Sequence, residues 1–350
     1  MDEDRRRRSA IIRWLLVVCV LLFLMVVLGG LTRLTESGLS IVEWRPLTGW
    51  IPPLGDGAWQ ELFYKYRTSP EYQKLNRGMT LDQFRGIFWL EFVHRLWGRL
   101  IGLAVAIPMI LFWWRGWLDR PLKIHLAVAL ALGAAQGVLG WLMVKSGLVD
   151  DPRVSPYRLA AHLGLGIFLY GYLFWVATGL IDLAPEVGPG PGDTGVRRRA
   201  LALTALVFVT ALSGALVAGL DAGLAYNTFP LMAGRLVPDG YFALGVTFGN
   251  MFENVAAVQF NHRVLATLTA LSALGFGLSV FRVIDNARLR RAIAYVAGAG
   301  LIQYGLGVLT LLKHVPVALG AAHQAMAVVL LTAALWAARI AGVAPVGARR

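Results

Sequence analysis

The chain has 350 residues, of which 57% are hydrophobic and only 15% are charged, with a formal net charge of +13. Soluble domains carry about a quarter charged residues, so this composition excludes a cytosolic enzyme and a disulfide-stapled secreted domain. Several apolar runs are long enough to cross a bilayer core, which takes roughly 20 helical residues. We therefore predict an all-α integral membrane protein.

Taken in chain order, the apolar runs predict eight membrane-spanning helices, at about 11–30, 87–112, 124–144, 159–181, 200–220, 254–281, 292–312 and 321–341. Lys and Arg collect on the side that holds the N-terminus, with 18 bases against 8 acids. Positively charged loops stay in the cytoplasm, so both termini are predicted to be cytoplasmic. The positive charge is then a signal of topology, and its partner is anionic membrane lipid rather than nucleic acid.

The connection at 31–86, which follows the first span, is rich in Trp, Tyr and Pro. This composition predicts short interfacial helices in a large outer loop. The single cysteine, Cys19, lies within the first span and excludes a disulfide inside one chain. The first residues are acidic rather than an Arg- and Ser-rich leader, which favours a bacterial inner membrane over import into a mitochondrion.

The second half of the chain repeats the first. Four pairs of motifs match in the same order: GGL with GAL, EFVHR with QFNHR, QGVLGWL with QYGLGVL, and AAH with AAH, at offsets of 185, 168, 167 and 161 residues. Four spans are an even number, so we predict two parallel copies of a four-helix bundle. The predicted domains are 1–181, a cytoplasmic linker at 182–199, and 200–350.

Four of the six histidines occupy matched positions near the outer ends of their spans: His94, His162, His262 and His323. An ionisable side chain at such a depth is costly and is functional by default. Two imidazoles in each bundle suit a porphyrin iron bound axially from facing helices. The alternative is that each histidine hydrogen-bonds a neighbouring helix, but the matched placement of all four favours ligands. His125 and His314 lack repeat partners, and we expect them at the interfaces.

A second motif places Glu91, His94 and Arg95 on one helix face. The second copy has Gln259 in place of the acid and keeps the arginine as Arg263. This difference predicts that the first site performs chemistry and the second passes electrons, with Glu91 moving protons or stabilising positive charge. The structural alternative is that Glu91 only neutralises Arg95. Both arginines are candidate contacts of porphyrin propionates or, alternatively, side chains that reach toward the outer headgroups.

The sequences GGLTRLTESGLSIVEWRPLTGWIPPL from Gly29 and EFVHRLWGR from Glu91, with the paired AAH elements, resemble the heme A synthase family over roughly residues 11–340. Because no cysteine lies in the outer loops, the resemblance is to its cysteine-free branch. The resemblance implies that heme O is the substrate on His94 and His162. It implies a heme b cofactor on the other histidine pair and a catalytic Glu91.

The activity that the resemblance implies is oxidation of the C8 methyl of heme O to a formyl group by two successive hydroxylations, which gives heme A for cytochrome oxidase. Its implied partners are an unidentified electron donor, heme O synthase and cytochrome oxidase assembly factors. The histidines place the heme sites toward the outer, periplasmic side of a cell inner membrane.

Two other classes of function use the same features. A di-heme b-type electron-transfer cytochrome needs the same four histidines, but it gives no special reason for Glu91 and would place hemes near both membrane faces. A transporter is compatible with parallel repeats, but its substrate site would lie near the midplane.

Overall fold

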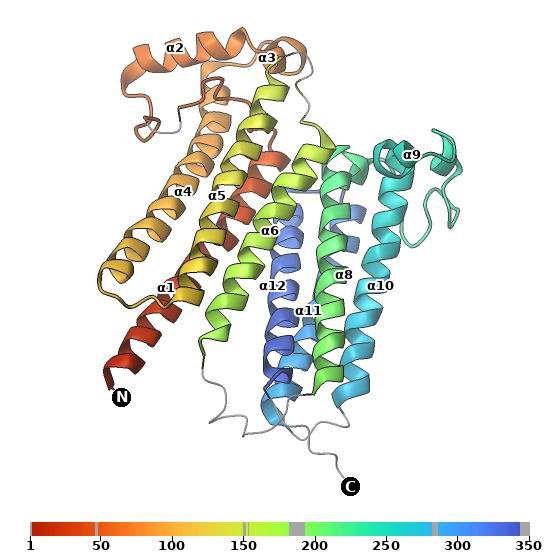
Figure 1. The fold of residues 1–350 in the computed structure, drawn as a ribbon. Coiled ribbons are helices and arrows are strands. Elements are labelled where there is room, and N and C mark those ends of the chain that lie inside the picture. Colours follow the sequence, from red (N-terminus) through yellow and green to blue (C-terminus); the bar gives the residue numbers. More distant parts are fainter. Residues whose placement is uncertain are drawn as a thin grey trace. The chain divides into compact units, whose positions relative to one another are not determined.

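The computed structural model describes residues 2–45, 48–149, 152, 154–181, 193–281 and 286–343, and its regular structure is helical (Figure 1). These ranges contain no strand, only an isolated bridge between Met232 and Arg235. The long helices are α1 Asp2–Leu34, α4 Leu81–Trp114, α5 Arg120–Gly147, α6 Pro156–Gly179, α8 Thr194–Gly219, α10 Val255–Phe281, α11 Ala287–Leu312 and α12 Val317–Ala341. The short ones are α2 Gly55–Arg67, α3 Pro70–Lys74, α9 Phe248–Glu253 and the 3₁₀ turns η1 Ala222–Leu224 and η2 Asp239–Phe242.

Within the described ranges, seven of the long helices qualify by length and composition as candidate membrane spans: α1, α4, α5, α6, α8, α11 and α12. In α10 the polar residues Gln259, Asn261, His262 and Arg263 lie near the start, and the 18 residues that follow, 264–281, carry no charged side chain. The prediction of an all-helical, multi-pass membrane protein is therefore confirmed with seven candidate spans. The finer prediction, eight spans in two parallel bundles, stays a prediction.

Side-chain caps explain why several helices begin before the apolar runs do. Thr80 and Gln83 form a capping box that starts α4 at Leu81. Asp193 caps α8 by accepting a hydrogen bond from the backbone N–H of Val196 at 2.9 Å. Residues 194–199 of the predicted linker are consequently the first turns of α8, and residues 182–192 lie outside the described residues.

By compactness the chain divides into two units: residues 20–166, and residues 1–19 together with 167–350. We call the second the 167–350 unit, after its longer part. In it, α10 and α12 each contact both α8 and α11. Gly300 of α11 faces Ala273 of α10 so closely that a Cβ on the glycine would lie 2.7 Å from the alanine Cβ. The hydroxyls of Thr210 and Thr269 link α8 to α10 at 2.8 Å. Small and hydroxyl side chains thus pack α10 closely against α8 and α11.

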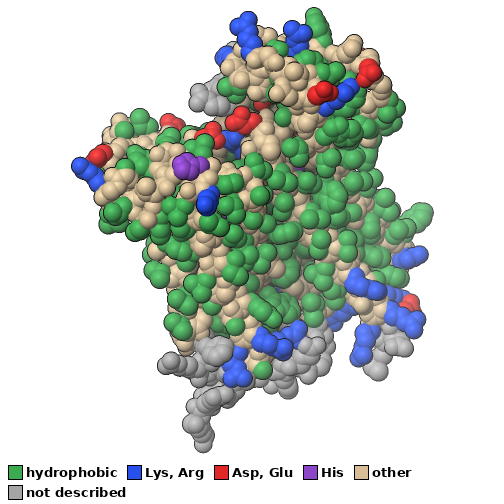
Figure 2. Space-filling view, turned by 180° about the vertical axis from the view of Figure 1, so that it is seen from behind, with side chains coloured by type: hydrophobic (Ala, Val, Ile, Leu, Met, Phe, Trp, Pro, Cys, Tyr) green, Lys and Arg blue, Asp and Glu red, His purple; other side chains and the backbone are tan. Residues whose placement is uncertain are grey.

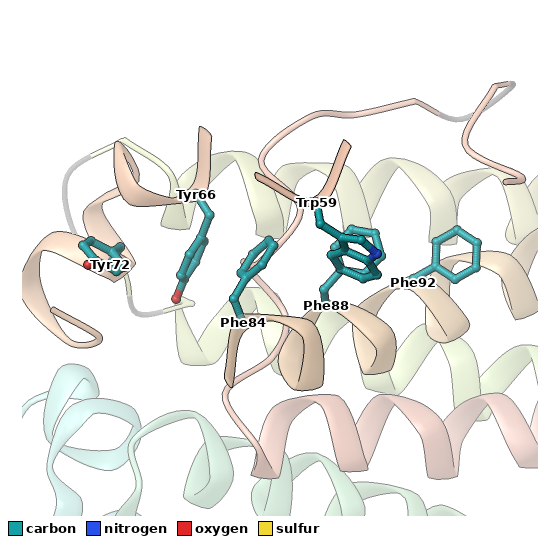
Figure 3. Close-up of a cluster of buried hydrophobic side chains, with 6 residues drawn as sticks. All are labelled: Trp59, Tyr66, Tyr72, Phe84, Phe88 and Phe92. Carbon is teal, nitrogen blue, oxygen red and sulfur yellow. The ribbon is translucent and has the colours of Figure 1, made fainter. Parts of the chain in front are cut away.

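In the 20–166 unit, six buried aromatic side chains join α4 to the segment between α1 and α4 (Figure 3). The sequence predicts that this segment is an outer loop, and we call it the outer segment. The six aromatic residues are Trp59, Tyr66, Tyr72, Phe84, Phe88 and Phe92. The last three recur every four residues and form one face of α4, and Tyr66 stacks on Phe84 with ring centroids 5.0 Å apart. The short helices predicted for 31–86 are therefore α2 and α3, which pack on the first turns of α4.

The surface has the distribution of side chains expected for lipid contact. Figure 2 shows broad areas of hydrophobic side chains, with Lys and Arg toward both the upper and the lower ends of the view. At the connection between α4 and α5, Lys123 lies over the ring of Trp113 at 5.2 Å and Arg115 over Trp117 at 5.4 Å. Such pairs of cations and aromatic rings are typical of membrane–water interfaces.

Candidate functional site

Each of the four repeat-matched histidines packs against a glycine of the preceding long helix. In the 20–166 unit, a Cβ on Gly29 of α1 would lie 3.4 Å from Nε2 of His94 on α4. One on Gly140 of α5 would lie 3.2 Å from Cε1 of His162 on α6. Both histidines belong to the 20–166 unit. The structure therefore brings the first predicted pair together in one unit.

The 167–350 unit repeats this arrangement. A Cβ on Gly214 of α8 would lie 3.1 Å from Cε1 of His262 on α10, and one on Gly307 of α11 would lie 2.8 Å from Cε1 of His323 on α12. The two imidazole rings are perpendicular, with centroids 6.5 Å apart. Gly214 and Gly307 stand 185 and 167 residues after the glycines of the first unit, so the sequence repeat is also a repeat of contacts.

The second pair fits the axial positions of a porphyrin iron. An imidazole nitrogen binds a first-row metal at about 2 Å, so rings at the separation of His262 and His323 leave space for one ion between them. A Cβ on Gly307 would overlap the ring of His323, and one on Gly140 or Gly214 would make an unusually tight contact, so the neighbouring helix restricts the positions of these three rings. The contact of Gly29 with His94 is of ordinary van der Waals length. The residues present therefore suit a heme ligated by two histidines.

Ser213, which the sequence analysis did not identify, distinguishes the second pair. Its Oγ lies 2.8 Å from Nδ1 of His262. This hydrogen bond engages Nδ1 and leaves Nε2 as the nitrogen that can bind a metal. The residue 185 positions earlier is Leu28, which has no polar group. The one sequence signal for Ser213 is that it directly precedes the repeat-matched Gly214.

Glu91 is buried, with 2% of its surface exposed, and accepts four hydrogen bonds. Oε1 accepts from Nε and Nη2 of Arg95 at 3.0 and 2.6 Å. Oε2 accepts from Oγ of Ser40 at 2.7 Å and from the backbone N–H of Ile41 at 2.8 Å. Glu91 therefore pairs with Arg95 and also joins α4 to the outer segment. Ser40 was missed from the sequence, because a serine 51 residues away gives no local signal.

The donors of Arg95 are directed at the same outer segment. Its Nη2 donates to the carbonyl of Ile41 at 2.9 Å, and its Nη1 donates to the carbonyl of Glu43 at 2.9 Å. The guanidinium also lies over the ring of Trp44, 5.3 Å from its centroid. Arg95 thus lies beside His94 in sequence and uses its donors on Glu91 and the backbone.

Gln259 and Arg263 form the matching contacts on α10. Gln259 is 2% exposed, and its Nε2 donates to the carbonyl of Ala222 at 2.7 Å. Arg263 donates to the carbonyls of Tyr226 and Thr228 at 2.7 and 2.8 Å. Helix α4 therefore binds the segment that follows α1, and helix α10 binds the segment that follows α8.

The two remaining histidines lie apart from these pairs. His125 is exposed in the first turns of α5, and His314 is exposed in the turn between α11 and α12. Whether these two residues lie at the membrane interfaces, as the sequence predicts, stays a prediction.

Comparison with known proteins identifies the family. Residues 12–335 match the family model of COX15-CtaA, described as cytochrome oxidase assembly protein. A heme A synthase of Nitrosomonas eutropha is 49% identical over 339 residues, which cover 97% of this chain and 95% of that protein. One from Nitrosospira multiformis is 50% identical over 335 residues, covering 96% and 94%.

The similarity extends beyond bacteria. The heme A synthase COX15 of Arabidopsis thaliana is 46% identical over 329 residues, which cover 91% of this chain and 72% of the plant protein. The resemblance seen in the sequence motifs is thereby confirmed, and the chain belongs to the COX15-CtaA family of cytochrome oxidase assembly proteins.

Proposed function

We propose that this protein is a heme A synthase, a membrane oxidoreductase that converts the C8 methyl of heme O to a formyl group. The observation that supports the proposal most strongly is the pair of matched glycine–histidine sites, one in each unit, in a chain whose family contains the heme A synthases. Two successive hydroxylations take the methyl to an alcohol and then to a geminal diol, which loses water to give the aldehyde.

In this proposal His94 and His162 bind heme O through its iron. Their glycine partners, Gly29 and Gly140, lie against these rings. Glu91, three residues before His94, is the catalytic carboxylate and stabilises positive charge that develops beside the methyl group. Its four hydrogen bonds hold it at a fixed position.

His262 and His323 hold a heme b, which when bound would pass electrons. Ser213 fixes the ring of His262, as ligating histidines usually require. Arg95 and Arg263 stand one residue after a ligand in each copy and remain candidates for contact with propionates. Their observed hydrogen bonds to backbone carbonyls agree better with a role in holding the outer segments.

The proposal includes the placement of the protein. Eight spans form two parallel bundles, at 1–181 and 200–350, in a cell inner membrane with both termini in the cytoplasm. The heme sites then lie toward the periplasm. The partners that we propose are an electron donor, heme O synthase and cytochrome oxidase assembly factors.

The test is to express the protein in cells that make heme O, purify it, extract the non-covalent hemes and identify them by chromatography and mass. We expect heme B together with heme O, its hydroxylated form and heme A. Heme B alone, at two per chain, would instead identify a di-heme electron carrier and overturn the proposal. His125→Ala, a change at an exposed histidine, is the matched control for alanine variants of the four ligands.

A further inference from the structure

The carboxylate of Glu91 can only accept hydrogen bonds, and the groups of the outer segment that it contacts are hydrogen-bond donors. There the outer segment presents two donors to Oε2, the hydroxyl of Ser40 and the N–H of Ile41. The other oxygen faces the guanidinium of Arg95. A carboxylate only accepts hydrogen bonds, so all four donors are satisfied. A glutamine here would point its NH₂ group at donors in either orientation.

The polarity is reversed around Gln259. Its Nε2 donates to the carbonyl of Ala222 at 2.7 Å and meets the carbonyl of Tyr226 at 3.3 Å. Its Oε1 accepts from Nη2 of Arg263 at 3.2 Å. Two backbone acceptors on one side and a cation on the other suit an amide, whereas a carboxylate would face two carbonyl oxygens. The difference between acid and amide therefore has a structural cause in both copies.

The hydrogen bonds of Arg95 and Arg263 show that the same arrangement occurs in both copies of the repeat. Arg95 donates to the carbonyls of Ile41 and Glu43, and Arg263 donates to those of Tyr226 and Thr228. The carbonyls of the second copy stand 185 residues after those of the first, which is also the offset between Gly29 and Gly214. Helices α4 and α10 thus each hold residues n and n+2 of the same repeated segment. We call this arrangement the clasp.

We propose that Ser40 and Arg95 are positioning residues, which act through the clasp to hold the Glu91 carboxylate in place beside the heme O site. The proposal rests on the proposed function for the reaction that Glu91 serves. In the second copy, Gln259 and Arg263 hold the segment 222–228 by hydrogen bonds to its backbone carbonyls, and no carboxylate takes part. The choice of residue at positions 91 and 259 is set by the outer segments as well as by chemistry.

The test uses reciprocal variants, Glu91→Gln and Gln259→Glu, with hydrogen–deuterium exchange of the peptides that cover 38–44 and 222–228. Glu91→Gln directs an amide NH₂ group at hydrogen-bond donors, and Gln259→Glu directs a carboxylate oxygen at two backbone carbonyl oxygens. Each variant therefore loses a buried hydrogen bond. We therefore expect exchange to rise by roughly tenfold to a hundredfold in the segment that the altered clasp holds. The other segment serves as the internal reference. Glu61→Gln, the same change at an exposed glutamate of α2, is the matched control.

A second set of variants tests positioning. Ser40→Ala removes one donor to Glu91, so we expect kcat to fall with KM for heme O and the bound-heme spectrum unchanged, and Ser40→Thr to restore kcat. Arg95→Lys keeps the charge but cannot reach both carbonyls, so exchange at 38–44 should rise. A fall in heme O binding in Ser40→Ala at unchanged kcat would contradict the positioning role.

The clasp and the proposed function can fail separately. If Glu91→Gln and Gln259→Glu leave exchange at wild-type rates in both segments, the clasp is wrong, even if Glu91→Gln produces no heme A. If the wild type produces no heme A but exchange changes as expected, the clasp stands and the proposed function fails.

Discussion

A glycine opposite each histidine determines how closely the imidazole can lie to the neighbouring helix. The tightest pair is Gly307 with His323, where an added Cβ would stand 2.8 Å from Cε1. Real Cβ atoms essentially never come this close to another atom. Nε2 of Gln303 also lies 3.5 Å from Nε2 of that ring. The orientation of His323 therefore depends on the missing side chain at position 307.

Gly307→Ala is expected to displace the ring of His323 and weaken heme b binding. Overpacking of this kind costs about 1–3 kcal/mol, which corresponds to roughly fivefold to 150-fold in the Kd for heme. Gly305→Ala on the same helix is the control, because its Cβ would meet no atom within 4 Å. The measurement is heme B content and absorption after purification. Equal heme B content in both variants would contradict the role of this contact.

At the residue scale, the sequence predicts the four histidines because their matched positions in the repeat are visible. It does not predict the hydroxyls that support them. Hydroxyl side chains in membrane helices usually donate to a carbonyl four residues earlier, as Thr204, Thr267 and Thr332 do. Nothing in the sequence shows that Ser213 also reaches a histidine on another helix, or that Ser40 reaches Glu91.

At the scale of elements, the α2–α3 segment contains a buried acid that the proposed reaction does not use. Glu71 is 3% exposed, and its Oε2 has no hydrogen-bond partner among the described residues. Burial raises the pKa of this carboxyl to about 7, the hydroxyl of Tyr66 opposes the rise, and the charges of Glu91 and Glu36 add to it. The segment therefore prefers Glu71 in its protonated form.

The stability of the α2–α3 segment is expected to depend on pH through Glu71. Because the pKa in the folded state is raised above its ordinary value of 4.5, the contribution is fully present below that value and is lost as pH rises through about 7. Glu71→Gln should stabilise the segment at pH 8 by up to about 3 kcal/mol and have little effect at pH 4. Limited proteolysis within 55–76 at both pH values measures this. An equal effect at pH 4 and pH 8 would contradict it.

The sequence predicts the helices better than it predicts their ends and connections. Every apolar run coincides with a helix, because hydropathy over about 20 residues is a strong signal. The first helix begins at Asp2 rather than near residue 11, since its charged turns continue the helix with a Glu3–Arg7 pair. The clasps could not be predicted, because they depend on which backbone atoms of a distant segment face the helix.

At the scale of the whole molecule, duplication gives each histidine pair its own supporting glycines within its own unit. Gly29 and Gly140 serve the first pair, and Gly214 and Gly307 serve the second. The glycine contacts of each histidine pair come from within its own unit. Heme binding at the two pairs should therefore be separable.

His323→Ala is expected to lose heme B while heme O remains bound through His94 and His162. Electron supply would then fail, so heme O should accumulate on the protein without conversion. Chromatography of extracted hemes against protein concentration gives the stoichiometry, with His125→Ala as the control. Loss of both hemes at an unchanged yield of folded protein would contradict separable sites.

The clasps also constrain the order in which the chain is built. Arg95 reaches back 52 and 54 residues to the carbonyls that it binds, and Arg263 reaches back 35 and 37. During synthesis, each outer segment therefore leaves the ribosome before its arginine exists and stays untethered until the next long helix has been inserted. A chain arrested before α4 would leave its first segment accessible to proteases, and completion of α4 would end that exposure.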